Sequence, residues 1–406
     1  MLNAEWKQGS VLRLLTTLNI QHSPFNIAFD LHLLAIIILV AWVMALLRTI
    51  VNLSLIPRLR ADMRPASAPL VSVIIPARDE ADIIERTVRA FLAQTYANLE
   101  VIVVNDRSAD GTGDIVRAIR DDRLTVIDGS EPSAGWLGKP WALHQGSDAA
   151  RGELLLFVDA DVFYAPAAVA AAVAHAHDRH SALLTLFPRF EMRGFGENAA
   201  MPMLAMFCFT FMPAWMSNRT RFAALAIGGG TGNLVTRSAY AASGGHEALR
   251  DAVVDDVALA RLVRRSGGTT EVVRADDLVS LRMYHGLAEV VEGFTKNAFA
   301  IYGRNYVFGL LINAAALIFH ILPYVLAFAG DRTGVATVVI ISVTRLILFR
   351  SLRYRLDSAL LLHPVMVAIW IWIFLRSMWL TGVRRKLLWR GRTYDARDTR
   401  FGAERR

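Results

Sequence analysis

The chain has 406 residues, of which 54% are hydrophobic, with a mean hydropathy of +0.37 and a net charge of +8. This composition is too apolar for a purely soluble protein, so part of the chain is expected in a membrane. The positive charge favours anionic lipid over nucleic acid as a partner, because many Arg and Lys residues stand beside apolar runs. The single cysteine, Cys208, excludes an internal disulfide and a thiolate metal site.

The first expected element is a membrane anchor. Residues 31–47 are uncharged and almost wholly apolar, and with their flanks they are long enough to span a bilayer as a helix. A cleaved signal peptide is the alternative, but a long segment precedes the run and no small-x-small cleavage site is clear. Residues 1–68 are therefore expected to hold an anchor at about 30–50 and a linker. The basic residues that follow place the next segment in the cytoplasm by the positive-inside rule: Arg48, Arg58, Arg60 and Arg64.

From Val71 the pattern changes to short apolar strands that alternate with helices. Helical spacing of apolar residues occupies 81–93. The expected strands are residues 71–75, 99–104, 124–127 and 154–158, with the first stopped by Pro76. Strand, helix and strand in this order predict an α/β domain, placed at 69–285, with a mostly parallel sheet and right-handed crossovers.

Acidic residues follow three of these strands and are expected to meet at one edge of the sheet, where open α/β sheets bind ligands. The first strand leads to Glu80, the second to Asp106, and the fourth to Asp159 and Asp161. Asp159 and Asp161 share one side of an extended chain, because side-chain direction repeats every two residues. Such a pair suits Mg²⁺ or Mn²⁺, which typically also holds a diphosphate. A solvated turn at the strand end is the alternative, since Asp-x-Asp is frequent by chance.

The order of these motifs resembles the family 2 glycosyltransferases of the GT-A fold. The resemblance covers residues 70 to about 285 and implies a Rossmann-like catalytic domain that uses a nucleotide-sugar donor. Six segments carry it, in the family's order: VSVIIPARDE from Val71, VIVVNDRSADGT from Val101, Gly138–Leu143, Asp159–Asp161, Gly230–Asn233 and Asp255-Asp256.

The resemblance implies a donor site at the strand ends. Asp106 would accept a hydrogen bond from the ring N–H of the base, and Lys139 would meet the diphosphate as a point charge. An ordinary solvated lysine is the alternative for Lys139. A Mg²⁺ or Mn²⁺ ion on Asp161, with Asp159 on the metal or the ribose, would stabilise the departing diphosphate as a Lewis acid. The expected donor-binding residues are Pro76, Ala77, Arg78, Glu80, Asp106, Lys139 and Asp159.

Asp256 is the candidate general base, beside Asp255, which stands where the family has a glutamate. A carboxylate near the acceptor hydroxyl can take its proton, and an acidic neighbour can raise the pKa of that base. The bland alternative is that one of these aspartates caps a helix expected at 257–264. A single base with direct displacement would invert the anomeric configuration. Three further residues are expected on the acceptor side, where little side-chain bulk permits close approach: Gly230, Gly232 and Asn233.

The remaining apolar stretches are expected at or in the membrane. Residues 199–216 form either a buried helix of the domain or an interfacial helix that lines a lipid entrance. Residues 286–305 suit an amphipathic helix on the membrane surface. Further membrane segments are expected in 306–381, and the basic residues of 382–406 favour a cytoplasmic tail. One segment, 334–350, is therefore expected to enter the membrane without crossing it.

Three segments look most like the hopanoid- and carotenoid-associated membrane glycosyltransferases: Gly135–Ala142, Asp255–Ala260 and Trp389–Tyr394. They imply a polycyclic or polyprenyl lipid acceptor. The Gln-x-x-Arg-Trp motif of processive relatives is replaced at residues 292–299, so transfer of one sugar or a few is expected.

The expected function is metal-dependent, inverting transfer of a sugar from a UDP-linked donor to a lipid. The enzyme is expected in a bacterial cytoplasmic membrane, as a multi-pass protein with its catalytic domain in the cytoplasm. A catalytically inactive nucleotide-binding scaffold and a nucleotidyltransferase of related fold are the alternatives. A transporter is disfavoured because it would not need so large an α/β domain.

Overall fold

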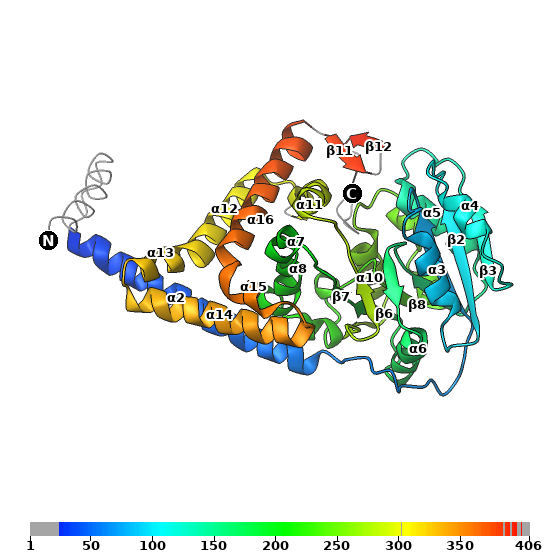
Figure 1. Ribbon diagram of the computed structural model, residues 1–406, viewed down its shortest axis with the longest axis horizontal. Coiled ribbons are helices and arrows are strands. Elements are labelled where there is room, and N and C mark those ends of the chain that lie inside the picture. Colours follow the sequence, from blue (N-terminus) through cyan, green and yellow to red (C-terminus); the bar gives the residue numbers. More distant parts are fainter. Residues whose placement is uncertain (1–23, 302, 385, 390–391, 396–398, 400–406) are drawn as a thin grey trace.

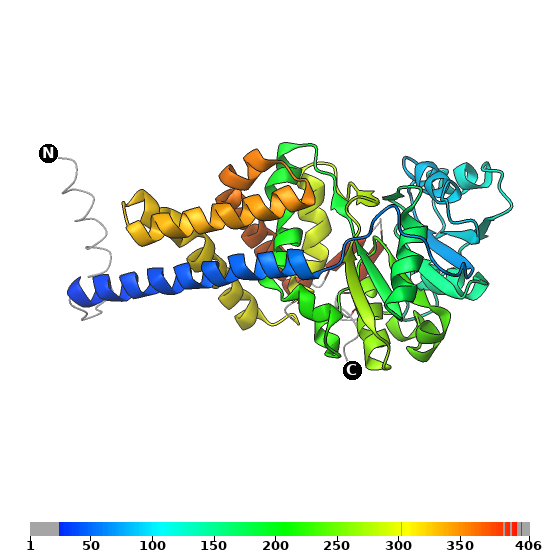
Figure 2. The same cartoon turned by 90° about the horizontal axis from the view of Figure 1, so that it is seen from below.

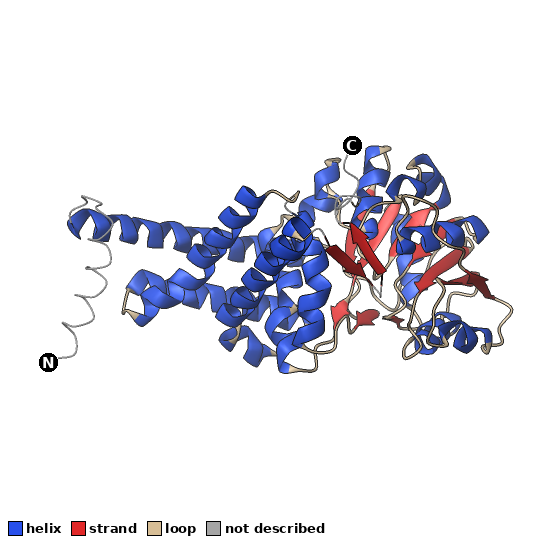
Figure 3. Cartoon of the chain, turned by 90° about the horizontal axis from the view of Figure 1, so that it is seen from above, coloured by secondary structure: helices blue, strands red, loops and turns tan. Residues whose placement is uncertain are grey.

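The computed structural model describes residues 24–301, 303–384, 386–389, 392–395 and 399. Helices gather at one end of the molecule and an α/β domain forms the other, as Figures 1 and 3 show. The first described helix, α2 (Pro24–Leu55), runs from the far end of the helical part to the edge of the domain. It is longer than the apolar run that predicts it.

A seven-stranded sheet forms the centre of the α/β domain, in the order β3-β2-β1-β4-β8-β6-β9. The neighbours β3-β2-β1-β4 pair in parallel, as do β6 and β9, and β8 is antiparallel to both of its neighbours. The mostly parallel α/β sheet expected from the sequence is confirmed. The strands are β1 (Val71–Ala77), β2 (Leu99–Asn105), β3 (Leu124–Asp128), β4 (Leu154–Phe157), β6 (Leu183–Phe187), β8 (Asn233–Thr236) and β9 (Thr270–Arg274).

The first strand continues past the point where the sequence predicts its end. Pro76 stays in register with Val104 of β2, and Ala77 pairs with Asn105. A proline is compatible with the last residues of a strand, because its fixed φ is extended enough and the missing N–H removes at most one ladder bond. The strand therefore delivers its loop directly beside that of β2.

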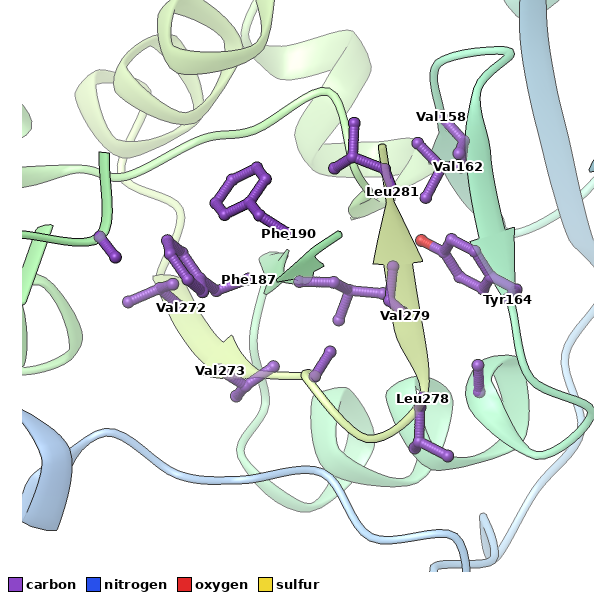
Figure 4. Close-up of a cluster of buried hydrophobic side chains, with 14 of the residues drawn as sticks. Val158, Val162, Tyr164, Phe187, Phe190, Val272, Val273, Leu278, Val279 and Leu281 are labelled. Atoms are coloured by element: carbon purple, nitrogen blue, oxygen red, sulfur yellow. The ribbon is translucent and has the colours of Figure 1, made fainter. Parts of the chain in front are cut away.

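Short helices cover the two faces of this sheet. They are α3 (Ile84–Leu92), α4 (Thr112–Arg117), α5 (Gly138–Ala149), α6 (Ala168–Asp178), α9 (Arg237–Ala242), η4 (Glu247–Leu249) and α10 (Asp255–Arg265). The helix α6 is rich in alanine and almost wholly buried, which lets its backbone lie close to the sheet. A smaller sheet of β5 (Val162–Tyr164), β10 (Val279–Leu281) and β7 (Arg189–Phe190) extends the core. Figure 4 shows Tyr164, Val279 and Leu281 in one apolar cluster with Phe187 and Phe190.

Four helical stretches are long and apolar enough to cross a membrane: 30–55, 306–328, 332–352 and 363–383. Large apolar side chains on them are exposed, including Val40 and Phe328, as expected for surfaces that face lipid. The elements after the domain are α12 (Tyr306–Ala316), η5 (Leu317–Ile321), α13 (Leu322–Phe328), α14 (Arg332–Leu352), α15 (Leu356–Leu361), α16 (His363–Ser377), η6 (Met378–Val383), β11 (Lys386–Trp389) and β12 (Arg392–Asp395).

The segment 334–350, expected to enter the membrane without crossing it, forms most of α14, a helix long and apolar enough to cross. The helix α14 lies along α2 and runs in the same direction, as Figures 1 and 2 show. In Figure 1 it is α16 that runs crosswise to both and returns toward the domain. The α16 end is tied there, because Ser377 Oγ accepts the Phe299 N–H at 2.9 Å.

The apolar run 199–216 becomes a chain of short helices: α7 (Phe195–Ala200), α8 (Pro202–Met206), η1 (Phe207–Phe211) and η2 (Ala214–Asn218). Of these, η1 and η2 pack on α2, whereas α7 packs on α11 and α16, and α8 on α14. Asn52 of α2 holds this chain, since its Nδ2 donates to Phe209 O and Met212 O at 2.8 Å each. Its Oδ1 accepts the Trp215 N–H at 2.9 Å. The broken helices thus find in α2 the partners that their own turns lack.

The α/β domain is also clamped to the ends of α2 and α14. Arg58, just after α2, forms ion pairs with Asp276 at 2.8 Å and Asp277 at 2.7 Å. Arg353, just after α14, reaches Asp277 at 2.7 Å. The helix α11 (Leu287–Ile301), which falls in the stretch expected as amphipathic, packs against α7 and α16.

Candidate active site

The loops after β1 and β2 are joined by hydrogen bonds between side chains and backbone. The Asp79 N–H donates to Ser108 Oγ at 3.1 Å, and the Ala109 N–H donates back to Asp79 Oδ1 at 2.8 Å. Further along, Glu80 N–H reaches Thr112 Oγ1 at 2.9 Å. The short polar side chains of these loops therefore fix one continuous rim at the strand ends.

Asp106 lies at the centre of this rim and is only 3% exposed. Its N–H donates to Ala77 O at 2.8 Å, and Arg78 Nη1 donates to Asp106 O at 3.0 Å. The Asp106 carboxylate is also 3.8 Å from Arg78 Nη1. The predicted donor residues Pro76, Ala77, Arg78 and Asp106 are thus brought together, with Glu80 on the same loop.

A second polar group gathers around Lys139 at the start of α5. Its Nζ is 2.6 Å from Asp159 Oδ1 and 3.5 Å from Asp255 Oδ1. The space among these side chains is about 10 Å³, which is room for roughly one water molecule. The residues that line it come from α5, the end of β4, the glycine-rich segment Gly228–Gly232, the start of β8, the turn before η4, and α10: Lys139, Leu143, Phe157, Val158, Asp159, Gly229, Gly230, Asn233, His246, Asp255, Asp256 and Leu259.

Burial and the neighbouring charges shift the pKa values of the ionisable groups in this cleft. Burial works against the charged ammonium, but the carboxylates of Asp159, Asp255 and Asp256 outweigh it and raise the pKa of Lys139. Burial raises the pKa of Asp255 to about 7, against the opposing effect of Lys139. Burial also raises the pKa of Asp256. A carboxyl whose pKa lies above its ordinary value is a better proton acceptor once it is ionised.

Asp256 is held at the first turn of α10. Its Oδ1 accepts the Val257 N–H at 2.7 Å, and its carbonyl oxygen accepts from Asn233 Nδ2 at 3.0 Å. The helix begins two residues earlier than expected, so both aspartates lie inside it and Val254 precedes it. Neither aspartate is therefore the N-cap residue, although the Asp256 carboxylate satisfies one N–H of the first turn.

The glycine-rich segment fits against both acidic groups because it has no side chains there. A Cβ on Gly228 would come within 2.1 Å of Asp256 O, and a Cβ on Gly230 within 2.1 Å of Asp159 Oδ2. The Asp159 N–H donates to Gly230 O at 2.8 Å. Gly232 lies behind the cleft lining, at a φ of 150° and with its Cα against Tyr164.

Asp161 and Asp159 offer the oxygen ligands that suit a divalent cation. Burial, and after it the charges of Asp159 and Glu80, raise the pKa of Asp161 to about 7. A cation at this place would relieve that repulsion, so the residues present fit a metal ion. Within the part of the chain that the structure describes, no three His, Cys, Asp or Glu side chains form a complete metal site.

His246 is a cleft residue that the sequence analysis missed. It is 1% exposed, its Nδ1 is 2.8 Å from Tyr240 Oη, and its ring lies 4.7 Å from that of Phe157. Burial lowers the pKa of His246 to about 3, so the ring is neutral. A single histidine after two glycines carries no periodic signal, and only its position ten residues before Asp256 could have suggested the site.

The α/β domain and most of the chain both have similar known proteins. Residues 72–241 match the model of Glycosyl transferase family 2. The 4,4'-diaponeurosporenoate glycosyltransferase of Staphylococcus aureus (strain MRSA252) is 25% identical over 345 residues, which cover 80% of this chain and 88% of the relative. The probable glycosyltransferase YdaM of Bacillus subtilis (strain 168) is 39% identical over 110 residues, 26% of each chain.

Among solved structures, the mannosyltransferase PcManGT from Pyrobaculum calidifontis, in complex with GDP-Man and Mn²⁺, superimposes with a TM-score of 0.53 at 21% identity. The match covers 85% of this chain and 98% of that one. The similarity establishes a shared GT-A fold that includes helices outside the sheet.

Proposed function

We propose that the chain is a glycosyltransferase, with residues 72–241 as its family 2 domain, and that it transfers a sugar from a nucleoside diphosphate to a membrane lipid, with inversion. The observation that carries the proposal is the meeting of Lys139, Asp159, Asp255 and Asp256 in one cleft beside the strand-end rim. A nucleotidyltransferase or an inactive scaffold has no support among the similar proteins.

The donor would lie along the carboxyl ends of β1, β2 and β4. The rim around Asp106 is suited to the base, and the proposed donor is UDP-linked. Lys139 would turn from Asp159 to the diphosphate, since an ammonium on a flexible stem can exchange one anion for another. A Mg²⁺ or Mn²⁺ ion held by Asp161 and Asp159, with diphosphate oxygens and water as its other ligands, would supply Lewis-acid stabilisation of the leaving group.

The chemical step needs one base. Asp256 takes the proton of the acceptor oxygen while that oxygen forms its bond to the anomeric carbon. The bond from the anomeric carbon to the donor phosphate breaks on the opposite side, and its electron pair leaves with the nucleoside diphosphate. Asp255 and Lys139 set the charge around the base, and Asn233 holds its backbone. The acceptor would approach past Gly230.

The proposed acceptor is a lipid of polycyclic or polyprenyl type, which receives one sugar or a few. The apolar helical stretches and the packing of η1 and η2 on α2 support a lipid route from the membrane to the cleft. Similarity to a carotenoid-type glycosyltransferase over most of both chains points the same way.

The proposed location is a bacterial cytoplasmic membrane, with the catalytic domain of residues 69–285 on the cytoplasmic side. The arginines after α2 support this orientation. The return of α16 toward the domain would place the basic tail on the same side.

Nucleotide binding to the purified full-length protein tests the donor site. UDP and GDP are titrated with and without Mn²⁺, beside Asp161→Asn and the control Asp148→Asn, whose side chain on α5 is exposed. We expect UDP binding that needs both the metal and Asp161. Metal-dependent binding of GDP alone would change the donor and keep the class of reaction. Binding of neither nucleotide would overturn the proposal.

A further inference from the structure

The segment between η2 and β8 exposes a surface that neither the cleft nor the fold uses. Phe222 is 71% exposed, and Arg219, Arg221 and Ala224 beside it are exposed as well. Arg219 lies 5.9 Å from the ring of Trp215, which is half-buried. Aromatic side chains with arginine are typical of the boundary between a bilayer and water.

This segment lies at the level where α2 leaves its apolar stretch. The Trp215 N–H is bonded to Asn52, in the last turn of the candidate span 30–55. Arg219 follows only four residues after Trp215, so it lies at about the same depth as the end of this candidate span. In Figure 2 the green chain that follows α8 lies beside the end of α2 that is nearest the domain.

The charge of the surrounding sequence fits an anionic partner. Residues 198–246 contain no Asp or Glu, whereas they include Arg219 and Arg221. Cations next to an anionic leaflet are attracted to it, and an acid at the same place would be repelled.

The inner side of this segment is hydrogen-bonded to α10, so its exposed side chains are held in a defined position. Arg264 of α10 is 5% exposed and donates to Ser217 O at 2.6 Å and to Phe222 O at 3.1 Å. Ala226 is buried against α10, and Gly228 touches Asp256. One short stretch of chain therefore joins the exposed Phe222 to the candidate base.

We propose that residues 219–224 form an insertion loop that binds the anionic headgroup layer of the bilayer. Phe222 enters the boundary between headgroups and acyl chains, and Arg219 and Arg221 meet lipid phosphates. Through Arg264 and the glycine-rich segment, the loop sets the height of Asp256 above the membrane. The proposal concerns membrane contact and holds whichever sugar or lipid the enzyme uses.

Site-specific fluorescence tests the insertion. Cys208 is the only cysteine, so a Cys208→Ala background permits single labels at Phe222→Cys and, as a second probe, Ala224→Cys. The control is Asp114→Cys on α4, where the native side chain is 89% exposed. The labelled full-length protein is placed in vesicles of phosphatidylcholine with phosphatidylglycerol, and in phosphatidylcholine alone.

We expect both loop labels to emit at shorter wavelength than the control label and to be quenched by lipid-borne spin labels but shielded from iodide. In the anionic vesicles, each of Arg219→Gln and Arg221→Gln should lower the ratio of inserted to exposed label about fivefold. Loop labels as open to iodide as the control would overturn insertion. Unchanged insertion without both arginines would overturn the headgroup contact. Shielding in detergent that grows with protein concentration would assign the loop to a second copy of the chain and contradict the proposal.

Discussion

Two regions beside the Lys139 cleft are held in place by different kinds of contact: the strand-end rim, which is the proposed donor half, and the segment from α7 to Gly230, which is the proposed acceptor half. The donor half consists of strand-end loops that bond to one another, such as Asp79 with Ala109 and Glu80 with Thr112. The acceptor half depends on partners far along the chain, such as Asn52 with Phe209 and Arg264 with Phe222. The proposed donor half therefore depends on the strand-end loops alone, whereas the proposed acceptor half depends on α10 and on α2, a candidate membrane span.

Under the proposed function, this difference would mean that a transferase acting on a lipid can keep its nucleotide site within the sheet while it builds its acceptor side from contacts with candidate membrane helices. Changes in the acceptor half should spare nucleotide binding. Changes in the donor rim should weaken nucleotide binding first.

The largest expected effect is at the base between the halves. Asp256→Asn keeps an oxygen for the Val257 N–H but removes proton acceptance. Sugar transfer should fall about 10²–10⁴-fold, which is the usual contribution of a general base. Nucleotide binding, measured by titration, should stay near that of the parent, as it should in Asp148→Asn. Transfer at the parent rate by Asp256→Asn would assign the proton to another group.

A change in α2 should impair transfer to the acceptor without impairing nucleotide binding. Asn52→Leu leaves Phe209 O, Met212 O and the Trp215 N–H without their partner, at a cost of about 3 kcal/mol. We expect loss of most transfer to lipid, with nucleotide affinity retained. The exposed neighbour Ile50, changed to Leu, serves as the control. Equal loss of nucleotide binding in Asn52→Leu would show that the two halves are not independent.

Acid should loosen the acceptor half through Glu197. Burial alone would raise the pKa of Glu197, but Arg282 and the N–H groups of Arg193 and Gly286 lower it to about 2. The pKa of a glutamate in an unfolded chain is about 4.3. The contribution of ionised Glu197 to the free energy of unfolding is therefore complete above that pH and is lost as the pH falls toward 2. Its full size is about 3 kcal/mol.

Melting temperatures of the parent and Glu197→Gln measure this contribution. The difference in melting temperature between the parent and Glu197→Gln should become smaller on acidification from about pH 5 to about pH 3. Glu85→Gln, which removes an exposed pair with Arg89, should show little gap at any pH. A gap for Glu197→Gln that is constant with pH would contradict the assigned pKa.

The smallest expected effect is in the donor rim. Asp110 accepts from the Ala81 N–H at 2.9 Å and the Thr112 N–H at 3.0 Å. Asp110→Ala removes these hydrogen bonds and should destabilise the bound arrangement of the loop by about 1 kcal/mol. Nucleotide binding should therefore weaken about fivefold. Transfer at saturating donor should change little. A defect in transfer with unchanged nucleotide affinity would reverse the assignment of this loop to the donor half.

The convergence of the acidic strand ends at one edge of the sheet could be predicted from the sequence because its signals are local. Acids directly after buried strands converge wherever the strands are parallel, so Asp106 and Asp159 could be placed without coordinates. The contact of Lys139 with Asp255 could not be derived from spacing, since it depends on how α10 is seated.

The acceptor half was read less well. The partner of residues 199–216 is a helix more than 140 residues earlier, and Asn52 within an apolar run gives no sign of what it binds. The expectation that 334–350 enters the membrane without crossing it rests on counting charges and stays a prediction. The direction of α16 has no such local signal, because it follows from contacts with α7 and α11.

Transfer of labelled sugar into lipid tests the central claim most directly. The full-length protein in vesicles of bacterial lipid extract is given Mn²⁺ and a panel of radiolabelled UDP-sugars and GDP-sugars, beside Asp256→Asn. The account predicts label in the organic phase with the parent and almost none with the variant. Label that stays in the aqueous phase for every donor that binds would contradict the claim that this cleft passes a sugar to a membrane lipid.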